Sequence, residues 1–270
     1  MKLAIMTDIH LDTNSLLTKK DLFPDLLYVL NKTEYDVLFI TGDISNSSRT
    51  TINILDKIKQ ETKRKVLYIP GNHDVTKFGE SSWESYNLLK DHESSLIDRP
   101  YKINDKVVII GDMGWYDYSF APEDLNHQII KQRKKSLWDD GKYVKWNMDD
   151  SEMFKFIYEK LKIQFEQCKN KQVIFGNHFI PYKDFILHSS DAEWNLCNGF
   201  MGSKMLGNLI DAYPNISHVL FGHTHRRYGV LEGFENKTII CNPVGYQYEW
   251  KTEDVRHEFA SCINIITIKD

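Results

Sequence analysis

The residues KLAIMTDIH, at positions 2–10, combine a short apolar run with polar residues directly after it. The same arrangement recurs in DVLFITGD at positions 36–43 and in KVLYIPGNHD at positions 65–74. Short, uninterrupted apolar runs that end at turn residues are typical of strands buried on both faces. The sequence therefore predicts one strand in each segment: Lys2–Thr7, Asp36–Thr41 and Lys65–Pro70.

The segments between these strands have the residue spacing of amphipathic helices. After the second strand, Ile52, Leu55 and Ile58 recur at helical intervals, with lysine and glutamine side chains on the opposite side. Strands that alternate with helices in this way predict a parallel sheet with helices packed on its faces.

The later part of the chain contains one long helical pattern and several more strand-like runs. Ser151–Cys168 is predicted to be an amphipathic helix, because its apolar residues line one face. The predicted strands are Val107–Gly111, Gln172–Gly176, His218–Gly222, Tyr228–Leu231, Lys237–Cys241 and Ile263–Lys269. Turn residues separate the last three strands, which indicates a second, more antiparallel sheet.

Length and composition are those of an ordinary globular protein. A chain of 270 residues buries roughly three quarters of the surface that its unfolded form exposes, so it folds without disulfides. The four cysteines form no CxxC pair, which fits a reducing compartment. The first apolar run, Leu3–Met6, is too short for a secretory signal or a membrane span. We therefore expect a cytoplasmic protein that does not contact membranes.

Residues 112–150 are the least regular part of the chain. This stretch is rich in aromatic residues and contains the basic run KQRKK at positions 131–135, which is typical of a solvated helix face. Long insertions in compact domains usually serve as lids or binding loops. We predict a single domain over residues 1–270, in which the insertion at about 112–150 forms a lid or an interaction surface rather than a platform for base stacking.

Polar residues of metal-binding type follow five of the predicted strands. They lie in DIH at 8–10, GD at 42–43, GNHD at 71–74, GNH at 176–178 and GHTH at 222–225. Ligands of parallel α/β sheets bind beyond the carboxyl ends of the strands, so these five loops are expected to converge on one site. Aspartate, asparagine and histidine without thiolates suit divalent Mn, Fe, Zn or Ni ions.

The five motifs, in this order and each after a predicted strand, resemble the calcineurin-like metallophosphoesterase family and its small bacterial-type members. The resemblance extends from Lys2 to about Gly245. It implies a four-layer α-β-β-α sandwich, made of two mixed sheets with helices on the outer faces. It also implies an enzyme that hydrolyses phosphate esters with two divalent metal ions.

The resemblance assigns seven metal ligands to this chain. The first metal site corresponds to Asp8, His10, Asp43 and His225. The second corresponds to Asp43, Asn72, His178 and His223, so that the carboxylate of Asp43 bridges both ions. Two metal ions so placed lower the pKa of a bridging water, and the resulting hydroxide is the implied nucleophile.

The resemblance also implies two catalytic residues that are not ligands. His73 corresponds to the histidine that stabilises or protonates the leaving oxygen, and Asp74 corresponds to the carboxylate that orients this histidine. A neighbouring carboxylate favours the imidazolium form that a general acid needs.

Departures from the family pattern bear on the substrate. Protein serine/threonine phosphatases carry GDxVDRG, whereas this chain has GDISNS at positions 42–47 and no arginine before Arg49. This disfavours protein dephosphorylation. From the complete ligand set and the modest insertion, we expect a small phosphodiester or phosphomonoester of nucleotide type as the substrate. A nuclease acting on DNA or RNA is the alternative, disfavoured by the net charge of −4. A scaffold of the same fold without activity is the alternative from another class, although no ligand has been lost.

Three features outside the motifs are candidates for substrate contact. His127 and His188 lie outside the motifs, and histidine is frequent in binding sites. The segment DAEWNLCN at positions 191–198 is a candidate for part of the pocket wall. The sequence does not indicate an oligomeric state.

Overall fold

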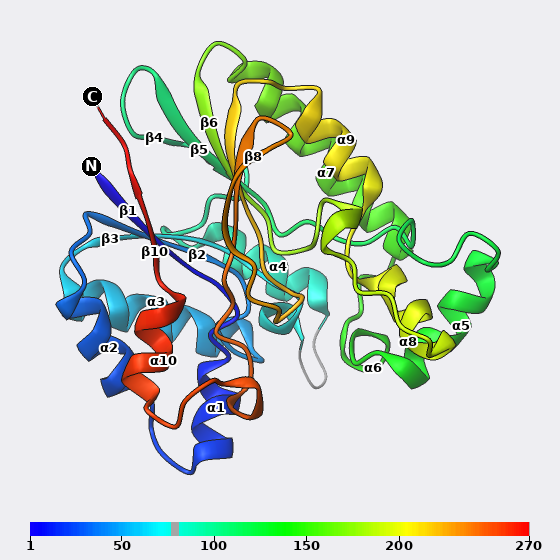
Figure 1. Cartoon of the computed structure of the whole chain (residues 1–270), viewed down its shortest axis with the longest axis horizontal. Coiled ribbons are helices and arrows are strands. Elements are labelled where there is room, and N and C mark those ends of the chain that lie inside the picture. Colours follow the sequence, from blue (N-terminus) through cyan, green and yellow to red (C-terminus); the bar gives the residue numbers. More distant parts are fainter. Residues whose placement is uncertain (77–80, 270) are drawn as a thin grey trace.

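Two mixed β-sheets form the centre of the molecule in the computed structural model, which describes residues 1–76 and 81–269 (Figure 1). The first sheet has the strand order β10-β1-β2-β3, in which β1, β2 and β3 are parallel and β10 is antiparallel to β1. Its strands are β1 (Lys2–Met6), β2 (Val37–Thr41), β3 (Lys65–Ile69) and β10 (Asn264–Thr267).

The second sheet has the order β4-β5-β6-β7-β9-β8. Its four inner strands are parallel, and the edge strands β4 and β8 are antiparallel to their neighbours. The strands are β4 (Tyr101–Lys102), β5 (Val107–Gly111), β6 (Gln172–Gly176), β7 (Ile216–Leu220), β8 (Gly229–Phe234) and β9 (Lys237–Cys241).

Helices cover the outer faces of both sheets (Figure 1). Those on the side of the first sheet are α1 (Leu11–Thr18), α2 (Phe23–Lys32), α3 (Ser48–Thr62), α4 (Ser82–Asp91) and α10 (Val255–Cys262). Those on the side of the second sheet are α7 (Asp150–Gln167) and α9 (Lys204–Asp211), while α5 (His127–Leu137), α6 (Asp140–Tyr143) and α8 (Ala192–Cys197) lie together beyond its end. Four short 3₁₀ helices complete the described elements: η1 (His73–Val75), η2 (Lys183–Phe185), η3 (Asn198–Phe200) and η4 (Gln247–Glu249). The predicted α-β-β-α architecture is confirmed.

The two sheets pack against each other through an apolar layer, which explains the uninterrupted apolar runs. In β2, Val37 and Phe39 face the other sheet, whereas Leu38 and Ile40 belong to the core that the helices cover. Because successive side chains of a strand point to opposite faces, a strand between two apolar layers must be apolar at every position.

The long helix α7 begins one residue earlier than predicted. Asp149 caps its amino end, and the side chain of Glu152 accepts a hydrogen bond from the backbone of Asp149 to complete a capping box. Met153, Ile157 and Leu161 are buried at helical spacing. The helix therefore begins at Asp150, where the side chain of Asp149 accepts hydrogen bonds from backbone N–H groups of the first turn.

One prediction about the later part of the chain is wrong. The last strand, β10, pairs with β1 of the first sheet, so the three C-terminal strands do not form a separate antiparallel sheet. Ile266 of β10 and Ile268, just after it, belong to the apolar layer between the sheets.

The basic run at 131–135 lies on α5, and four of its five residues are exposed, as predicted for a solvated helix face. Lys134 is the exception, because it is buried and its Nζ lies 2.8 Å from both carboxylate oxygens of Asp150.

No helix in the described part of the chain combines the length and the apolar character needed to cross a membrane.

We predict that Phe39→Ala lowers the free energy of unfolding by about 3–5 kcal/mol, because the phenyl ring is fully buried against Gly176 and its loss leaves a cavity between the sheets. Denaturant titration measures this change. Leu16→Ala is the control, since its side chain is 78% exposed and should change stability by no more than about 0.5 kcal/mol. Equal effects of the two substitutions would contradict this description of the core.

Candidate metal centre

The loops after β1, β2, β3, β6 and β7 are joined by backbone hydrogen bonds into one surface. The N–H of His10 donates to the carbonyl of Asp43 at 2.9 Å, and the N–H of Gly222 donates to the carbonyl of His178 at 3.0 Å. The N–H of His223, from the second sheet, donates to Oδ1 of Asp8, from the first, at 2.9 Å. The loops of the two sheets are therefore held in a fixed relation.

Five of the seven predicted ligands have a left-handed backbone conformation. They are Asp8 (φ 52°), His10 (φ 43°), Asp43 (φ 55°), His223 (φ 67°) and His225 (φ 52°). This conformation costs an L-residue roughly 1–2 kcal/mol, and such strain concentrates at functional sites. The strained turns direct these side chains toward the same small volume.

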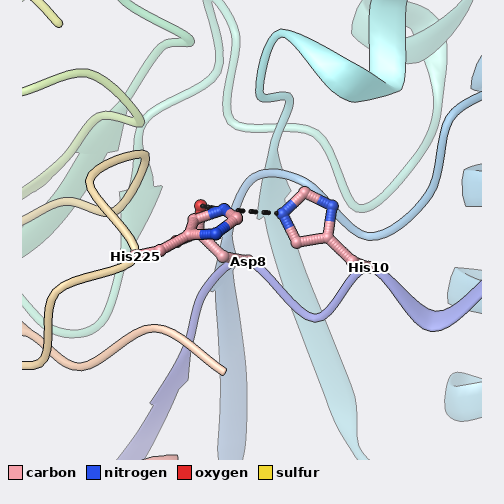
Figure 2. A group of neighbouring side chains, drawn as sticks. All are labelled: Asp8, His10 and His225. Carbon is pink, nitrogen blue, oxygen red and sulfur yellow. Dashed lines mark hydrogen bonds and ion pairs between the residues drawn. The ribbon is translucent and has the colours of Figure 1, made fainter. Parts of the chain in front are cut away.

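The structure brings six of the seven predicted ligands, together with His73, into three overlapping groups. The potential donor atoms within each group lie within 4.8 Å of one another. The groups are Asp8 with His10 and His225, His10 with Asp43 and His73, and Asp43 with His178 and His223. Figure 2 shows the first of them, in which Nε2 of His10 lies 3.0 Å from Nε2 of His225.

Asn72 lies between two of the histidines. Its Oδ1 is 3.1 Å from Nε2 of His178 and 3.0 Å from Nδ1 of His223. Nε2 of His178 is also 3.1 Å from Oδ2 of Asp43. All seven predicted ligands thus border one volume at the junction of the two sheets.

The chemistry of these donors fits divalent metal ions. Oδ2 of Asp43 is buried and faces two ring nitrogens, Nε2 of His178 at 3.1 Å and Nε2 of His10 at 3.8 Å. Burial lowers the pKa of His10 and of His223 well below the ordinary value, so both rings are neutral and keep a lone pair for a metal. Burial acts to raise the pKa of Asp43, but the neighbouring histidines outweigh it and hold this pKa well below its usual range.

Two glycines leave room for the carboxylates. A Cβ atom at Gly71 would collide with the carboxylate of Asp43, and one at Gly222 would collide with that of Asp8. Because these glycines precede Asn72 and His223 directly, each motif brings one ligand close to a ligand of another loop.

Asp74 stabilises the loops themselves. Its carboxylate is fully buried and accepts five hydrogen bonds of 2.6–3.2 Å, from the backbone N–H groups of Asp43, Ile44, Ser45 and Gly71 and from the hydroxyl of Thr51. It therefore ties the loop after β2 to the loop after β3.

This arrangement corrects the predicted role of Asp74 beside His73. Nδ1 of His73 lies 2.7 Å from Oδ1 of Asn46, and its Nε2 lies 3.3 Å from the hydroxyl of Tyr246. The oxygens of Asp74 are instead engaged by backbone donors and Thr51, so the prediction that Asp74 orients His73 is wrong. Asn46 makes the orienting contact.

Three further residues of the site, Glu249, Asp140 and Tyr246, were not predicted from the sequence. Oε2 of Glu249 lies 2.8 Å from Nδ1 of His225. Asp140 is fully buried, and its Oδ1 accepts a hydrogen bond from Nδ2 of Asn72 at 2.9 Å. That bond fixes which end of the Asn72 amide faces the histidines, a typical contribution of groups around metal ligands. Tyr246 contacts His73, as described above.

A cavity of about 500 Å³ opens beside the seven residues. Asp43, Asn72, His73, His223 and His225 line one end. Residues 137–140, from the predicted insertion, and residues from 180 to 201 line the rest, including Trp194 of the segment predicted to shape the pocket. His127 and His188 are exposed and are not among the described residues that line it.

Comparisons with known proteins agree with this geometry. A model of the calcineurin-like phosphoesterase family matches residues 1–227. A Coxiella burnetii protein named "probable cyclic nucleotide phosphodiesterase" is 21% identical over 272 residues, which cover 92% of this chain and 91% of that protein.

Two solved structures share the fold. Phosphopantetheinyl hydrolase from Mycobacterium tuberculosis superposes with a TM-score of 0.72 at 18% identity, covering 94% of this chain and 92% of that one. A dimetal phosphatase from Danio rerio gives a TM-score of 0.51 at 14% identity, with 90% and 87% covered.

We predict that Mn²⁺ stabilises the protein and that Asp43→Asn abolishes this effect. At a hundred times its dissociation constant, an ion that binds only the folded state adds about 2.7 kcal/mol to the free energy of unfolding. Asparagine tolerates the left-handed backbone of position 43, so this change removes the charge without adding strain. Thermal unfolding with and without Mn²⁺ measures the effect, and His127→Ala should behave like the unmodified chain. A full Mn²⁺ shift in Asp43→Asn would contradict the ligand assignment.

Asp140→Asn is predicted to weaken Mn²⁺ binding by about 10- to 100-fold, although Asp140 is not a candidate ligand. Three donors now share the two oxygens of this carboxylate: Asn72 donates to Oδ1, and Tyr116 and Trp138 donate to Oδ2. The new amide keeps only one acceptor oxygen, so its NH₂ group would face either the amide of Asn72 or the donors of Tyr116 and Trp138. Isothermal titration calorimetry measures the affinity. The adjacent, exposed Asp139 provides the matched change, Asp139→Asn, for which we expect unaltered affinity. Equal affinities in both variants would show that Asp140 has no positioning role.

Proposed function

The chain belongs to the calcineurin-like phosphoesterase family and is a metal-dependent phosphoesterase, and we propose that it hydrolyses small phosphate esters of nucleotide type at a two-metal centre. The overlap of the three donor groups carries this proposal. Asp43 belongs to two of these groups, one with His10 and one with His178 and His223, as expected of a ligand between two ions. The matching relative named as a cyclic nucleotide phosphodiesterase supports a nucleotide-type ester.

The proposed ligands are those predicted from the sequence. Asp8, His10, Asp43 and His225 would hold one ion, and Asp43, Asn72, His178 and His223 the other. Two bound ions polarise the phosphoryl oxygens and lower the pKa of the attacking water. Mn, Fe, Zn and Ni all suit this donor set.

His73 is the proposed proton donor to the leaving oxygen. It lines the cavity, its ring centroid lies 4.8 Å from that of His10, and Asn46 holds its Nδ1. Oδ1 of Asn46 is an acceptor and so takes up Nδ1–H, which leaves Nε2 as the nitrogen that would give its proton to the departing alcohol; the hydroxyl of Tyr246 lies 3.3 Å from it. Asp74 has a positioning role in this proposal, through the backbone of the two loops.

The shape of the site favours small esters over the alternatives. A cavity of about 500 Å³ is of the size that encloses a small molecule. A nuclease would need cations along the path of a nucleic-acid backbone, and the described residues that line this cavity include no lysine or arginine. A scaffold without activity would not need to retain all seven ligands.

The same observations extend to the organisation of the protein. We keep the proposal of a single domain over residues 1–270, in which the insertion at 112–150 supplies a wall of the cavity through residues 137–140. The four cysteines form no disulfide, which supports the proposed cytoplasmic location.

The metal-loaded protein should hydrolyse aryl phosphate diesters or monoesters and cyclic nucleotides, and should act much less on single-stranded DNA. His73→Ala should lower kcat by about 10²–10⁴-fold, the usual contribution of a general acid, without loss of the Mn²⁺-dependent stabilisation. Steady-state kinetics across this panel measures both effects. Full activity of His73→Ala would remove its proposed role, and absence of hydrolysis after metal loading would favour the scaffold.

A further inference from the structure

The cavity continues from the candidate metal centre into a region that phosphate chemistry does not require. We call it the apolar compartment and define it by six residues that line the cavity: Leu137, Trp138, Phe185, Leu187, Trp194 and Met201. They come from the end of α5 and from the stretch between β6 and α9, outside the five metal-binding motifs.

Trp138 joins the apolar compartment to the metal centre. Its ring centroid lies 5.9 Å from that of His223, and its Nε1–H donates to Oδ2 of Asp140 at 3.1 Å. Asp140 in turn binds the Asn72 amide. A group attached to a phosphate at the metal centre would therefore meet the indole of Trp138 first.

Trp194 is the second tryptophan that lines the apolar compartment. Half of its surface (50%) is exposed, although its Nε1–H donates to the carbonyl of Leu187 at 3.0 Å and so fixes the ring. A large aromatic surface held rigidly in water at the wall of a cavity is available to cover an apolar or aromatic ligand.

The charged side chains that line the cavity are acidic. The described residues that line it include the carboxyl groups of Asp139, Asp140 and Glu249 but no lysine or arginine. The nearby Lys142 is paired with Asp139, and Arg133 with Glu193. A phosphate at the metal centre would have the ions as its counter-charge, whereas a second phosphate in the apolar compartment would have none.

We propose that the apolar compartment binds the uncharged, apolar or aromatic part of a phosphate ester with a single phosphoryl group, and that it excludes substrates with a second phosphate. This rests on the proposed function only in placing the phosphoryl group at the metal centre. Trp138 and Trp194 determine specificity, and neither takes part in bond breaking.

Calorimetric binding to the Mn²⁺-loaded protein tests this directly with three non-hydrolysable phosphonates. They are methylphosphonate, biphenyl-4-ylphosphonate, and biphenyl carrying a phosphonate at each end. The biphenyl compound should bind about tenfold or more tightly than methylphosphonate, because its rings bury apolar surface. The second phosphonate should cancel most of that gain. Equal binding of the first two compounds, or tighter binding of the third, would overturn the proposal.

Variants of Trp194 locate the effect. Trp194→Ala should reduce the preference for the biphenyl compound over methylphosphonate several-fold, and Trp194→Arg should strengthen binding of the bisphosphonate by supplying the missing cation. Phe156→Ala is the matched control, because Phe156 is a partly exposed aromatic residue on α7 that does not line the cavity. An unchanged preference in Trp194→Ala would assign the binding to another surface.

Binding and hydrolysis report on different claims. If the phosphonates follow the expected order but no ester is hydrolysed, the proposed function fails and the compartment stands. If esters are hydrolysed and the phosphonates bind alike, the proposed function stands and the compartment has no role in selection.

Discussion

Hydrogen bonds to the buried carboxylate of Asp74 fix the two loops on which the metal centre depends. Four backbone N–H groups from the loops after β2 and β3 point at this one side chain. Bonds to a charged acceptor contribute about 1.5–3 kcal/mol each. They hold Asp43 in its left-handed conformation and place Gly71 against its carboxylate. The central ligand is therefore positioned by an acid that does not reach the cavity.

Polar contacts of the candidate ligands also connect the two sheets. The carboxylate of Asp8 accepts the backbone N–H of His223, and Nδ1 of His178 lies 3.0 Å from the carbonyl of Thr41. Each contact joins a loop of the first sheet to a loop of the second. The candidate ligands thus serve the protein twice, as donors toward the metal volume and as connections between the two halves of the fold. The apolar layer between the sheets brings the strand ends together, and these polar contacts set their register.

Asp140 connects the wall of the cavity to a candidate metal ligand, Asn72. This carboxylate binds the amide of Asn72 with one oxygen and the indole of Trp138 with the other. Trp138, in the wall of the cavity, and Asn72, a candidate metal ligand, therefore share one hydrogen-bonded partner. A change in Trp138 would therefore affect the position of Asn72.

The strands and the candidate ligands could be predicted from local sequence patterns. Runs apolar at every position require burial on both faces, and each ligand motif follows such a run directly, so the position of Asp8 or His223 is set by the strand before it. The contacts around the candidate ligands could not be predicted, because they depend on the tertiary structure. Asn46 meets His73 across 27 residues, Asp140 meets Asn72 across 68, and Tyr246 meets His73 across 173. The pairing of β10 with β1 likewise joins the two ends of the chain. Such contacts form only when distant segments pack, and no local spacing of residues encodes them.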